Sequence, residues 1–140
     1  MNLRDLLDGW LNGNLPAPPI VQQLGMRLVE YGEGQAVVEM HAHRGLWNAM
    51  GTLHGGVFAD LADVAMGVAL ATVAQEGETF TTSHLEVHFF GSIREGGLRA
   101  RAVVVRRGRS TAYAECEIRN EAEALLAKAS STCIFQTLSS

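Results

Sequence analysis

Cysteine is scarce in this sequence, and acidic residues outnumber basic ones. The two cysteines, Cys116 and Cys133, both lie in segments with strand character. This favours a cytosolic protein with reduced thiols, with a single disulfide between those strands as the alternative. Eleven Lys and Arg against fifteen Asp and Glu give a net charge of −4. No global positive field is therefore available to hold nucleic acid or an anionic membrane, and an anionic ligand needs a local basic patch.

Long apolar runs are also absent. No segment reaches the roughly 18 apolar residues that a membrane-spanning helix requires. The first residues, MNLRDLLDGWLNGNLPAPP, carry Asp5 and Asp8 and have no basic stretch followed by a continuous apolar run, so they do not have the pattern of a secretory signal. The sequence therefore predicts a cytoplasmic protein with no membrane partner.

The length of 140 residues predicts one main domain. Before it, apolar residues recur at helical spacing and stop ahead of Gly13 and the PAPP segment: Leu3, Leu6, Leu7, Trp10 and Leu11. We expect a short amphipathic helix and a proline-rich turn over residues 1–19, and the domain proper over residues 20–140.

The rest of the chain alternates strand-like runs with one helical segment. Two strand-like runs at 20–32 and 35–43 are separated by GEG, a helical segment covers about 54–74, and four more strand-like runs follow at about 79–90, 98–107, 110–119 and 124–136. The segments RRGRS and RNEAEA are the predicted turns between the last three strands. This order favours an α+β fold with a meander-like antiparallel sheet and one dominant helix.

The predicted helix is apolar on all sides. Stepping about 100° per residue places Leu61 and Val68 on the face of Val57, and Ala62 and Met66 on the opposite face. A helix of this kind is buried. The sheet must therefore wrap it, and another subunit is expected to supply further cover.

Two carboxylates interrupt this apolar helix. Between His54 and Gln75 the only ionisable side chains are Asp60 and Asp63. A buried carboxylate needs a partner or a wet cavity, because burial without either raises its pKa until it neutralises. Each aspartate is therefore either a structural residue near the helix start, interacting with the helix dipole or an arginine, or a general base or nucleophile in a pocket. Asp60 suits the first reading better, and Asp63 the second.

A double glycine precedes the helix. Gly55 and Gly56 have no Cβ, so a ligand oxygen could approach their N–H groups at the positive end of the helix dipole, as in an oxyanion hole. A glycine pair at a helix start is also often only a tight turn. Gly55 and Asp63 are about 12 Å apart along one helix. If both act on one bond, they come from two subunits with antiparallel helices, which makes a homodimer part of the chemistry.

At this point the chain resembles the hotdog-fold acyl-CoA thioesterases of the phenylacetate-pathway and 4-hydroxybenzoyl-CoA branch. The resemblance covers about residues 20–136 and rests on Asn48, GTLHGG at 51–56, the LAD that ends at Asp63, TSHLEVHFFGSI at 82–93 and RRGRST at 106–111. It implies a long central helix wrapped by a curved antiparallel sheet of five or six strands. It also implies homodimers with shared active sites, assembled into a homotetramer.

The resemblance implies a role for each matching residue. Gly55 is the backbone donor to the thioester oxygen, Asn48 and His54 orient the carbonyl or the attacking water, Asp63 is the catalytic acid residue and Thr82 supports the nucleophilic water. The implied reaction is hydrolysis of an acyl-CoA to the free acid and CoA, with no metal and no other cofactor. The residues expected to bind CoA lie at the tight turn around Gly108: Arg106, Arg107, Arg109 and Ser110.

Alternatives remain open at this stage. A hotdog hydratase or dehydratase would use His54 and Asp63 to move a proton next to the carbonyl, and a non-catalytic acyl-CoA binding module would not need Asp63. His41 and His43 with His84 or His88 lack an acid or cysteine at a suggestive spacing, so we expect no metal site. The acyl group is expected to be aromatic or phenylacetyl-like, or of medium chain length. Its pocket would be lined by large apolar residues that could equally be ordinary core: Trp47, Met50, Phe58, Phe89 and Phe90.

Overall fold

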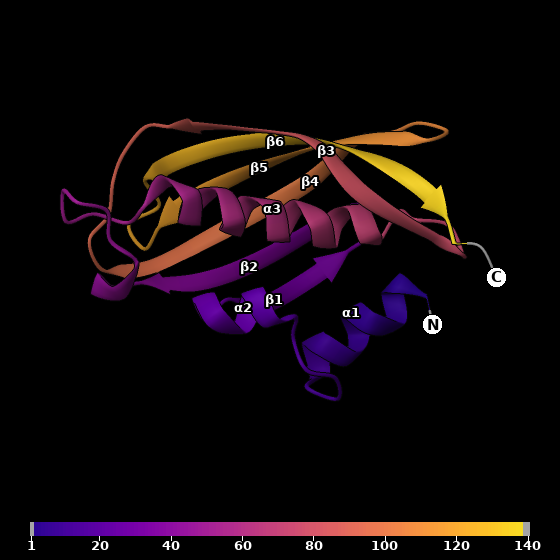
Figure 1. Ribbon diagram of the computed structural model, residues 1–140, viewed down its shortest axis with the longest axis horizontal. Coiled ribbons are helices and arrows are strands. Elements are labelled where there is room, and N and C mark those ends of the chain that lie inside the picture. Colours follow the sequence, from indigo (N-terminus) through magenta and orange to yellow (C-terminus); the bar gives the residue numbers. More distant parts are fainter. Residues whose placement is uncertain (1, 139–140) are drawn as a thin grey trace.

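The computed structural model describes residues 2–138, in which one curved antiparallel sheet wraps one long helix (Figure 1). The strands are β1 (Arg27–Gly32), β2 (Gln35–Ala42), β3 (Glu78–Phe89), β4 (Gly96–Arg107), β5 (Thr111–Asn120) and β6 (Leu125–Thr137). The long helix is α3 (Gly55–Ala71), which lies along the concave side of the sheet. The predicted α+β class, the curved sheet and the central helix are therefore confirmed.

The order of the strands differs from a simple meander. β4, β5 and β6 follow one another through tight turns, as expected, but the full order is β1-β2-β4-β5-β6-β3. β3 pairs with β6 from Glu78 opposite Thr137 to Phe89 opposite Ala127, and β2 pairs directly with β4. The reason is that α3 crosses the sheet between β2 and β3, so β3 lies at the opposite edge of the sheet from β1.

The first predicted strand is wrong in its first half. Residues 20–24 belong to a short helix, α2 (Pro19–Leu24), and the strand begins only at Arg27. Pro19 suits the first turn of a helix because it lacks an N–H that would be unsatisfied there, and Gly25 ends the helix with a φ of 67°. Burial of Val21 against the core holds α2 in place.

The predicted N-terminal helix is confirmed as α1 (Leu3–Asn12), which ends at Gly13 with a φ of 83°. Both α1 and α2 lie outside the sheet beside β1 (Figure 1). The Arg4 guanidinium donates a hydrogen bond of 2.9 Å to the Thr72 carbonyl, just past the end of α3. α1 thus supplies a cation to the negative end of the central helix.

The central helix is buried on the sheet side and open on the other. Leu61, Ala65 and Met66 have no exposed surface, whereas Asp60 is exposed and Asp63 and Gly67 are partly exposed. Its last turn is fixed by Thr72, whose Oγ1 donates to the Ala69 carbonyl at 2.6 Å and accepts from the Gly34 N–H at 2.7 Å. One chain therefore leaves a strip of α3 uncovered.

The two cysteines are buried free thiols. Cys116 lies opposite Ala129 and Cys133 opposite Ala112, so the strand register does not bring the two sulfurs together. Burial raises the pKa of the Cys116 thiol to about 12, which keeps it protonated and unreactive. None of the helices within residues 2–138 has the length and apolar character needed to cross a membrane.

Candidate active site

The start of α3 is built by His54 and two glycines. His54 is the N-cap, and its Nδ1 accepts a hydrogen bond of 2.8 Å from the Gly56 N–H. With Nδ1 as acceptor, the neutral ring carries its proton on Nε2. Within residues 2–138 no acceptor takes the N–H of Gly55. The positive end of α3 therefore presents one free backbone donor, at the residue expected to bind the thioester oxygen.

Asn48 organises the loop that leads to this helix. Its Oδ1 accepts from the N–H groups of Met50 at 2.9 Å and Thr52 at 3.2 Å, and its Nδ2 donates to the Thr52 Oγ1 at 3.0 Å. The Leu53 N–H donates to the Ile93 carbonyl at 2.8 Å. The structure thus shows Asn48 holding the loop, while its expected contact with substrate stays a prediction.

The His54 cap gives a direct prediction. Replacing His54 by alanine removes the acceptor of the Gly56 N–H and should lower the free energy of unfolding by about 1 kcal/mol, the usual effect of losing an N-cap. For a protein of this size the melting temperature should fall by about 2–4 °C. Thermal denaturation followed by circular dichroism measures the change.

The matched control is His54→Asn, which restores a capping oxygen and should recover the lost stability. If the asparagine variant regains stability without regaining hydrolysis, the Nε2 side of the ring acts on the substrate. If alanine costs no stability, the capping role is wrong.

Asp63 and Thr82 meet on the open side of α3. The Thr82 hydroxyl, on β3, donates a hydrogen bond of 3.2 Å to the Asp63 Oδ1. Burial raises the pKa of the Asp63 carboxyl above its ordinary value, the Thr82 hydrogen bond opposes this rise, and the negative charge of Asp60 adds to it. A half-buried carboxylate with a raised pKa suits a group that takes a proton near neutral pH.

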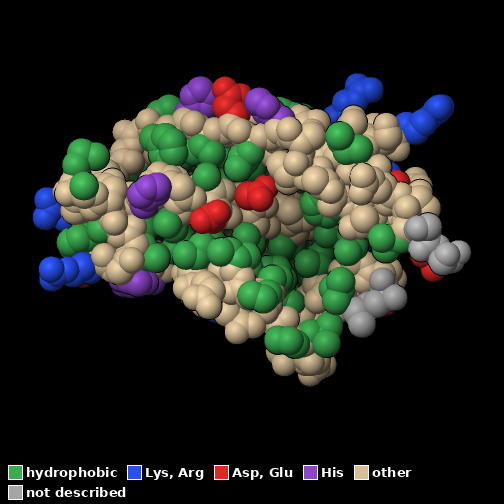
Figure 2. Space-filling model, viewed as in Figure 1, with side chains coloured by type: hydrophobic (Ala, Val, Ile, Leu, Met, Phe, Trp, Pro, Cys, Tyr) green, Lys and Arg blue, Asp and Glu red, His purple; other side chains and the backbone are tan. Residues whose placement is uncertain are grey.

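Figure 2 looks onto the face that carries α3 and shows acidic side chains in its middle, surrounded by hydrophobic ones. The acidic residues of α3 are Asp60 and Asp63. Asp63 lies eight residues after Gly55, which corresponds to about 12 Å along the helix axis. A single chain therefore brings Asp63 together with Thr82, and it places His54 next to Gly55. It does not bring the Asp63 pair to the Gly55 end of the helix.

Aromatic side chains lie beside the free N–H of Gly55. Phe58 and Phe89 contact edge to face, with ring centroids 5.8 Å apart. A Cβ on Gly55 would lie 3.3 Å from the Phe89 Cζ, so the glycine allows this ring to approach. Of the residues predicted to be either acyl pocket or ordinary core, Phe58 belongs to the core, whereas Phe89, Phe90 and Met50 are exposed.

The predicted CoA-binding turn has one member with a structural partner. The Arg107 Nη2 lies 2.7 Å from the Glu78 Oε1, and its guanidinium carbon lies 3.5 Å from the Phe135 ring centroid. Arg107 therefore links the end of β4 to the start of β3, and its guanidinium is already engaged by Glu78 and Phe135. Arg106, Arg109 and Ser110 are exposed at the turn.

The sequence reading missed Arg44 and Arg94. Trp47 links them, because its backbone N–H donates to the Arg44 carbonyl and its indole Nε1 donates to the Arg94 carbonyl at 2.7 Å. Both side chains are exposed, and within residues 2–138 neither has an acidic partner. The two residues are 50 positions apart, so no spacing could have paired them. They are cations at the Gly55 end of α3.

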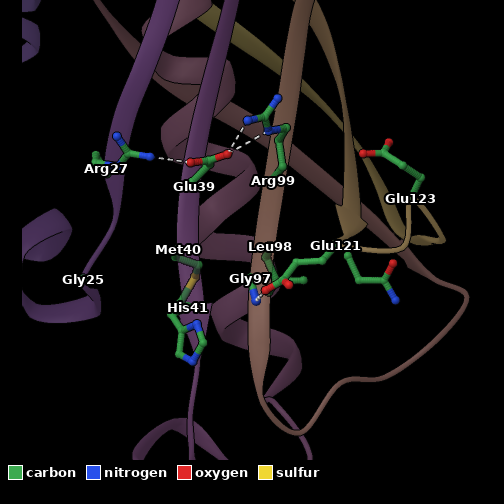
Figure 3. A pocket seen from close by; sticks show the side chains of 11 residues that line it. Gly25, Arg27, Glu39, Met40, His41, Gly97, Leu98, Arg99, Glu121 and Glu123 are labelled. Carbon is green, nitrogen blue, oxygen red and sulfur yellow. Dashed lines mark hydrogen bonds and ion pairs between the residues drawn. The ribbon is translucent and has the colours of Figure 1, made fainter.

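A further cavity lies away from these residues. It has a volume of about 630 Å³ and opens on the outer side of the sheet, between β2, β4 and the turn after β5. Figure 3 shows an ion-pair group among its lining residues, in which Glu39 joins Arg27 and Arg99 at 2.6 Å each. The Glu39 carboxylate offsets one of the two arginine charges, and Asp63 and Gly55 are not part of this cavity. His41 also lines it, on β2, while His88 is on β3, and the strands β4, β5 and β6 lie between them.

A six-stranded antiparallel sheet curved around one long helix defines the hotdog class of proteins. The family profile described as the thioesterase superfamily matches residues 50–127. The chain belongs to this superfamily and is a thioester hydrolase.

Two relatives and one solved structure illustrate the similarity. The 1,4-dihydroxy-2-naphthoyl-CoA hydrolase of Listeria monocytogenes is 29% identical over 105 residues, which cover 75% of this chain and 85% of the relative. A protein of Archaeoglobus fulgidus with the provisional name of esterase is 32% identical over 114 residues, 81% of this chain and 72% of the relative. The crystal structure of a thioesterase from Haemophilus influenzae superposes with a TM-score of 0.84 at 25% identity, over 91% of this chain and 89% of the other.

Proposed function

We propose that the protein hydrolyses acyl-CoA thioesters to a carboxylic acid and free CoA, with an aromatic or phenylacetyl-like acyl group preferred over a medium chain. The observation that carries the proposal is the half-buried Asp63 carboxylate, with its raised pKa, on a helix whose first N–H is free. The aromatic preference is supported by the exposed Phe89 beside Gly55. It is also supported by the Listeria relative, whose name gives an aromatic acyl-CoA as its substrate.

In the proposed reaction, the thioester oxygen accepts a hydrogen bond from the Gly55 N–H. As water attacks the carbonyl carbon, negative charge develops on this oxygen and strengthens the bond, which lowers the barrier. Asp63 takes the proton of the attacking water, or attacks the carbonyl directly. Thr82 holds the carboxylate in position through its hydroxyl. When Asp63 acts as the base, it returns this proton to the leaving sulfur of CoA. When Asp63 attacks directly, it displaces the CoA thiolate, and water then cleaves the acyl anhydride, which releases the free acid and restores the carboxylate.

A homodimer completes the proposed site. Gly55 and Asp63 are too far apart on one helix to reach one carbonyl, and the open strip of α3 faces away from its own sheet. β3 is an edge strand with exposed apolar side chains at Leu85 and Phe89. An uncovered edge of this kind favours pairing with another chain. Two chains with antiparallel α3 helices would place Gly55 of each beside Asp63 of the other.

A panel of thioesters tests the proposed function. Acetyl-, hexanoyl-, benzoyl- and phenylacetyl-CoA are incubated with the protein, and free thiol is measured with a chromogenic thiol reagent. We expect thiol release, with the highest kcat/KM for the aromatic substrates. Absence of thiol release from every substrate contradicts the proposal. Addition of water to an unsaturated acyl-CoA without thiol release would instead identify a hydratase.

The phosphates of CoA are proposed to contact Arg106 and Arg109, while Arg107 keeps its structural role. Replacing both Arg106 and Arg109 by alanine should raise KM for acyl-CoA about tenfold or more, because each charge-assisted hydrogen bond to phosphate contributes about 1 kcal/mol or more. Steady-state kinetics on the same acyl group carried by pantetheine, which has no phosphate, should show no change.

The matched control is Arg101→Ala, which removes an exposed arginine from the outer face of β4. This variant should keep the wild-type KM for both substrates. If KM of the double variant rises equally for acyl-CoA and for the pantetheine thioester, the turn does not bind phosphate. Arg44 and Arg94 then become the better candidates for contacting the CoA phosphates.

A further inference from the structure

Neither the backbone conformation nor the packing of the chain requires a glycine at position 67. It lies inside α3, where glycine is the least favourable residue after proline. Its φ is not positive, so the backbone does not demand glycine. A Cβ built on Gly67 would meet no atom within 4 Å, whereas one on Gly55 or Gly56 would lie 3.3 Å from Phe89 or 3.0 Å from His54. The space beside Gly67 is therefore open, and neither packing nor turn geometry within the chain explains it.

This space lies one turn beyond Asp63. Residues four apart on a helix share a face, and the rise between them is about 6 Å. Gly67 therefore follows the proposed catalytic carboxylate on the same uncovered strip of α3. One turn before Asp63, on the other side, lies the exposed carboxylate of Asp60.

The two directions along this strip differ in chemistry. Beyond Asp63 the partly exposed residues are the apolar Val64 and Gly67 itself, and Ala71 one turn further on is buried in the core. Toward the start of the helix the strip carries the charge of Asp60. A thioester held at Asp63 has an apolar acyl group on one side of its carbonyl and the polar, anionic CoA on the other. The apolar group avoids the charged side because burying a carboxylate against it would be unfavourable.

We propose that the open space over Gly67 receives the acyl group, and that the missing side chain at this position sets the largest acyl group the enzyme accepts. The inference rests on the proposed function, because it takes Asp63 as the catalytic carboxylate. One helical turn of free space beside Asp63 suits a ring attached to the carbonyl directly or through one methylene. Gly67 is thus a determinant of substrate size and takes no part in the chemical step.

Two substitutions test the proposal by filling the space in steps. Gly67→Ala and Gly67→Leu both favour the helix, so both variants are expected to fold. Gly67→Leu should lower kcat/KM for phenylacetyl-CoA at least about tenfold relative to acetyl-CoA, since pocket contacts of this size change selectivity by 10- to 200-fold. The alanine variant should show a smaller change in the same direction. Ala122→Leu, in the exposed turn after β5, adds similar bulk far from α3 and should leave the ratio unchanged.

Each result has a defined reading. A selective loss on phenylacetyl-CoA, with the oligomeric state unchanged in analytical ultracentrifugation, supports the proposal. An unchanged ratio overturns it. An equal loss of kcat/KM for both substrates, together with dissociation of the oligomer, also overturns it, because the space is then filled by the helix of a partner subunit. If the wild-type protein releases thiol from no substrate, the proposed function itself has failed, which is a different outcome from active variants with unchanged selectivity.

Discussion

Exchanging Asp63 for asparagine is expected to lower kcat for acyl-CoA hydrolysis by about 10²- to 10⁴-fold, the usual contribution of a positioned general base. Asparagine has nearly the same shape and can still accept the hydrogen bond of the Thr82 hydroxyl, but it cannot take a proton from water or attack the carbonyl. Thiol release under saturating phenylacetyl-CoA measures the loss. If Asp63→Asn hydrolyses as fast as the wild type, the role proposed for Asp63 is wrong.

Asp60→Asn is the matched control because it makes the same change one turn away. We expect kcat to stay within a few-fold of the wild type. Since the charge of Asp60 raises the pKa of the Asp63 carboxyl, its removal should move the acid limb of the pH–rate profile to lower pH. Thr82→Val removes the hydrogen bond that lowers this pKa and should move the limb to higher pH.

The same pKa shift affects stability. The pKa of Asp63 is raised on folding, mainly by burial, so the folded state favours the protonated form. The stabilising contribution is present below about pH 4, the ordinary value for Asp, and is lost as the pH rises through the higher folded pKa. At neutral pH the asparagine variant should therefore melt at a higher temperature than the wild type, although its kcat is much lower. This combination separates a catalytic carboxylate from a structural one.

Mixing two inactive variants is expected to restore hydrolysis. In Gly55→Pro the backbone donor is lost, and in Asp63→Ala the carboxylate is lost. A mixed dimer has one site that combines the intact Gly55 of one chain with the intact Asp63 of the other. If subunits exchange at random, half of the dimers are mixed and one of their two sites is complete, so activity should recover to about a quarter of the wild-type value.

The structure makes proline an informative substitution at Gly55. Proline is favoured in the first position of a helix, and His54 before it has φ −62° and ψ 136°, an extended conformation that a following proline accepts. Gly55→Ala is the matched control because it adds a Cβ beside Phe89 but keeps the N–H. The alanine variant should therefore retain much more activity than the proline variant.

The mixture is prepared by partial denaturation and refolding, and tagged subunits report how many mixed dimers form. Mixed dimers that form in the expected amount but show no thiol release would contradict a site shared between subunits. Activity in Gly55→Pro alone would show that the Gly55 N–H is not the donor to the thioester oxygen.

Much of the fold followed from local patterns in the sequence. The uninterrupted apolar segment after His54 predicted α3, and the turn residues around Gly108 and after Asn120 predicted the hairpins between β4, β5 and β6. These elements were predictable because hydrophobic periodicity and turn chemistry depend only on neighbouring residues. The half-strand predicted at 20–24 was wrong because a five-residue segment of apolar residues and glutamines suits either a strand or a short helix. Packing of Val21 into the core selects the helix.

The residue types of the candidate site were also readable from the sequence. The apolar surroundings of Asp63 and the glycines at the start of the helix drew attention to both. The sequence could not show which neighbours these groups contact. Thr82 comes from a strand 19 positions later, and it meets Asp63 only because β3 runs back past the open side of α3. Arg107 was an equal member of a basic turn until the fold placed Glu78 and Phe135 against it.

The sequence by itself determined the α+β class and the buried helix with its two carboxylates. It also determined that Gly55, at the start of this helix, and Asp63 are about 12 Å apart along it. Only the tertiary structure decided the position of β3 at the sheet edge, the partners of Asp63 and Arg107, and the open space beside Gly67. The physical reason is that periodicity and capping act over a few residues. Strand order and side-chain contacts instead depend on which distant segments the sheet brings together.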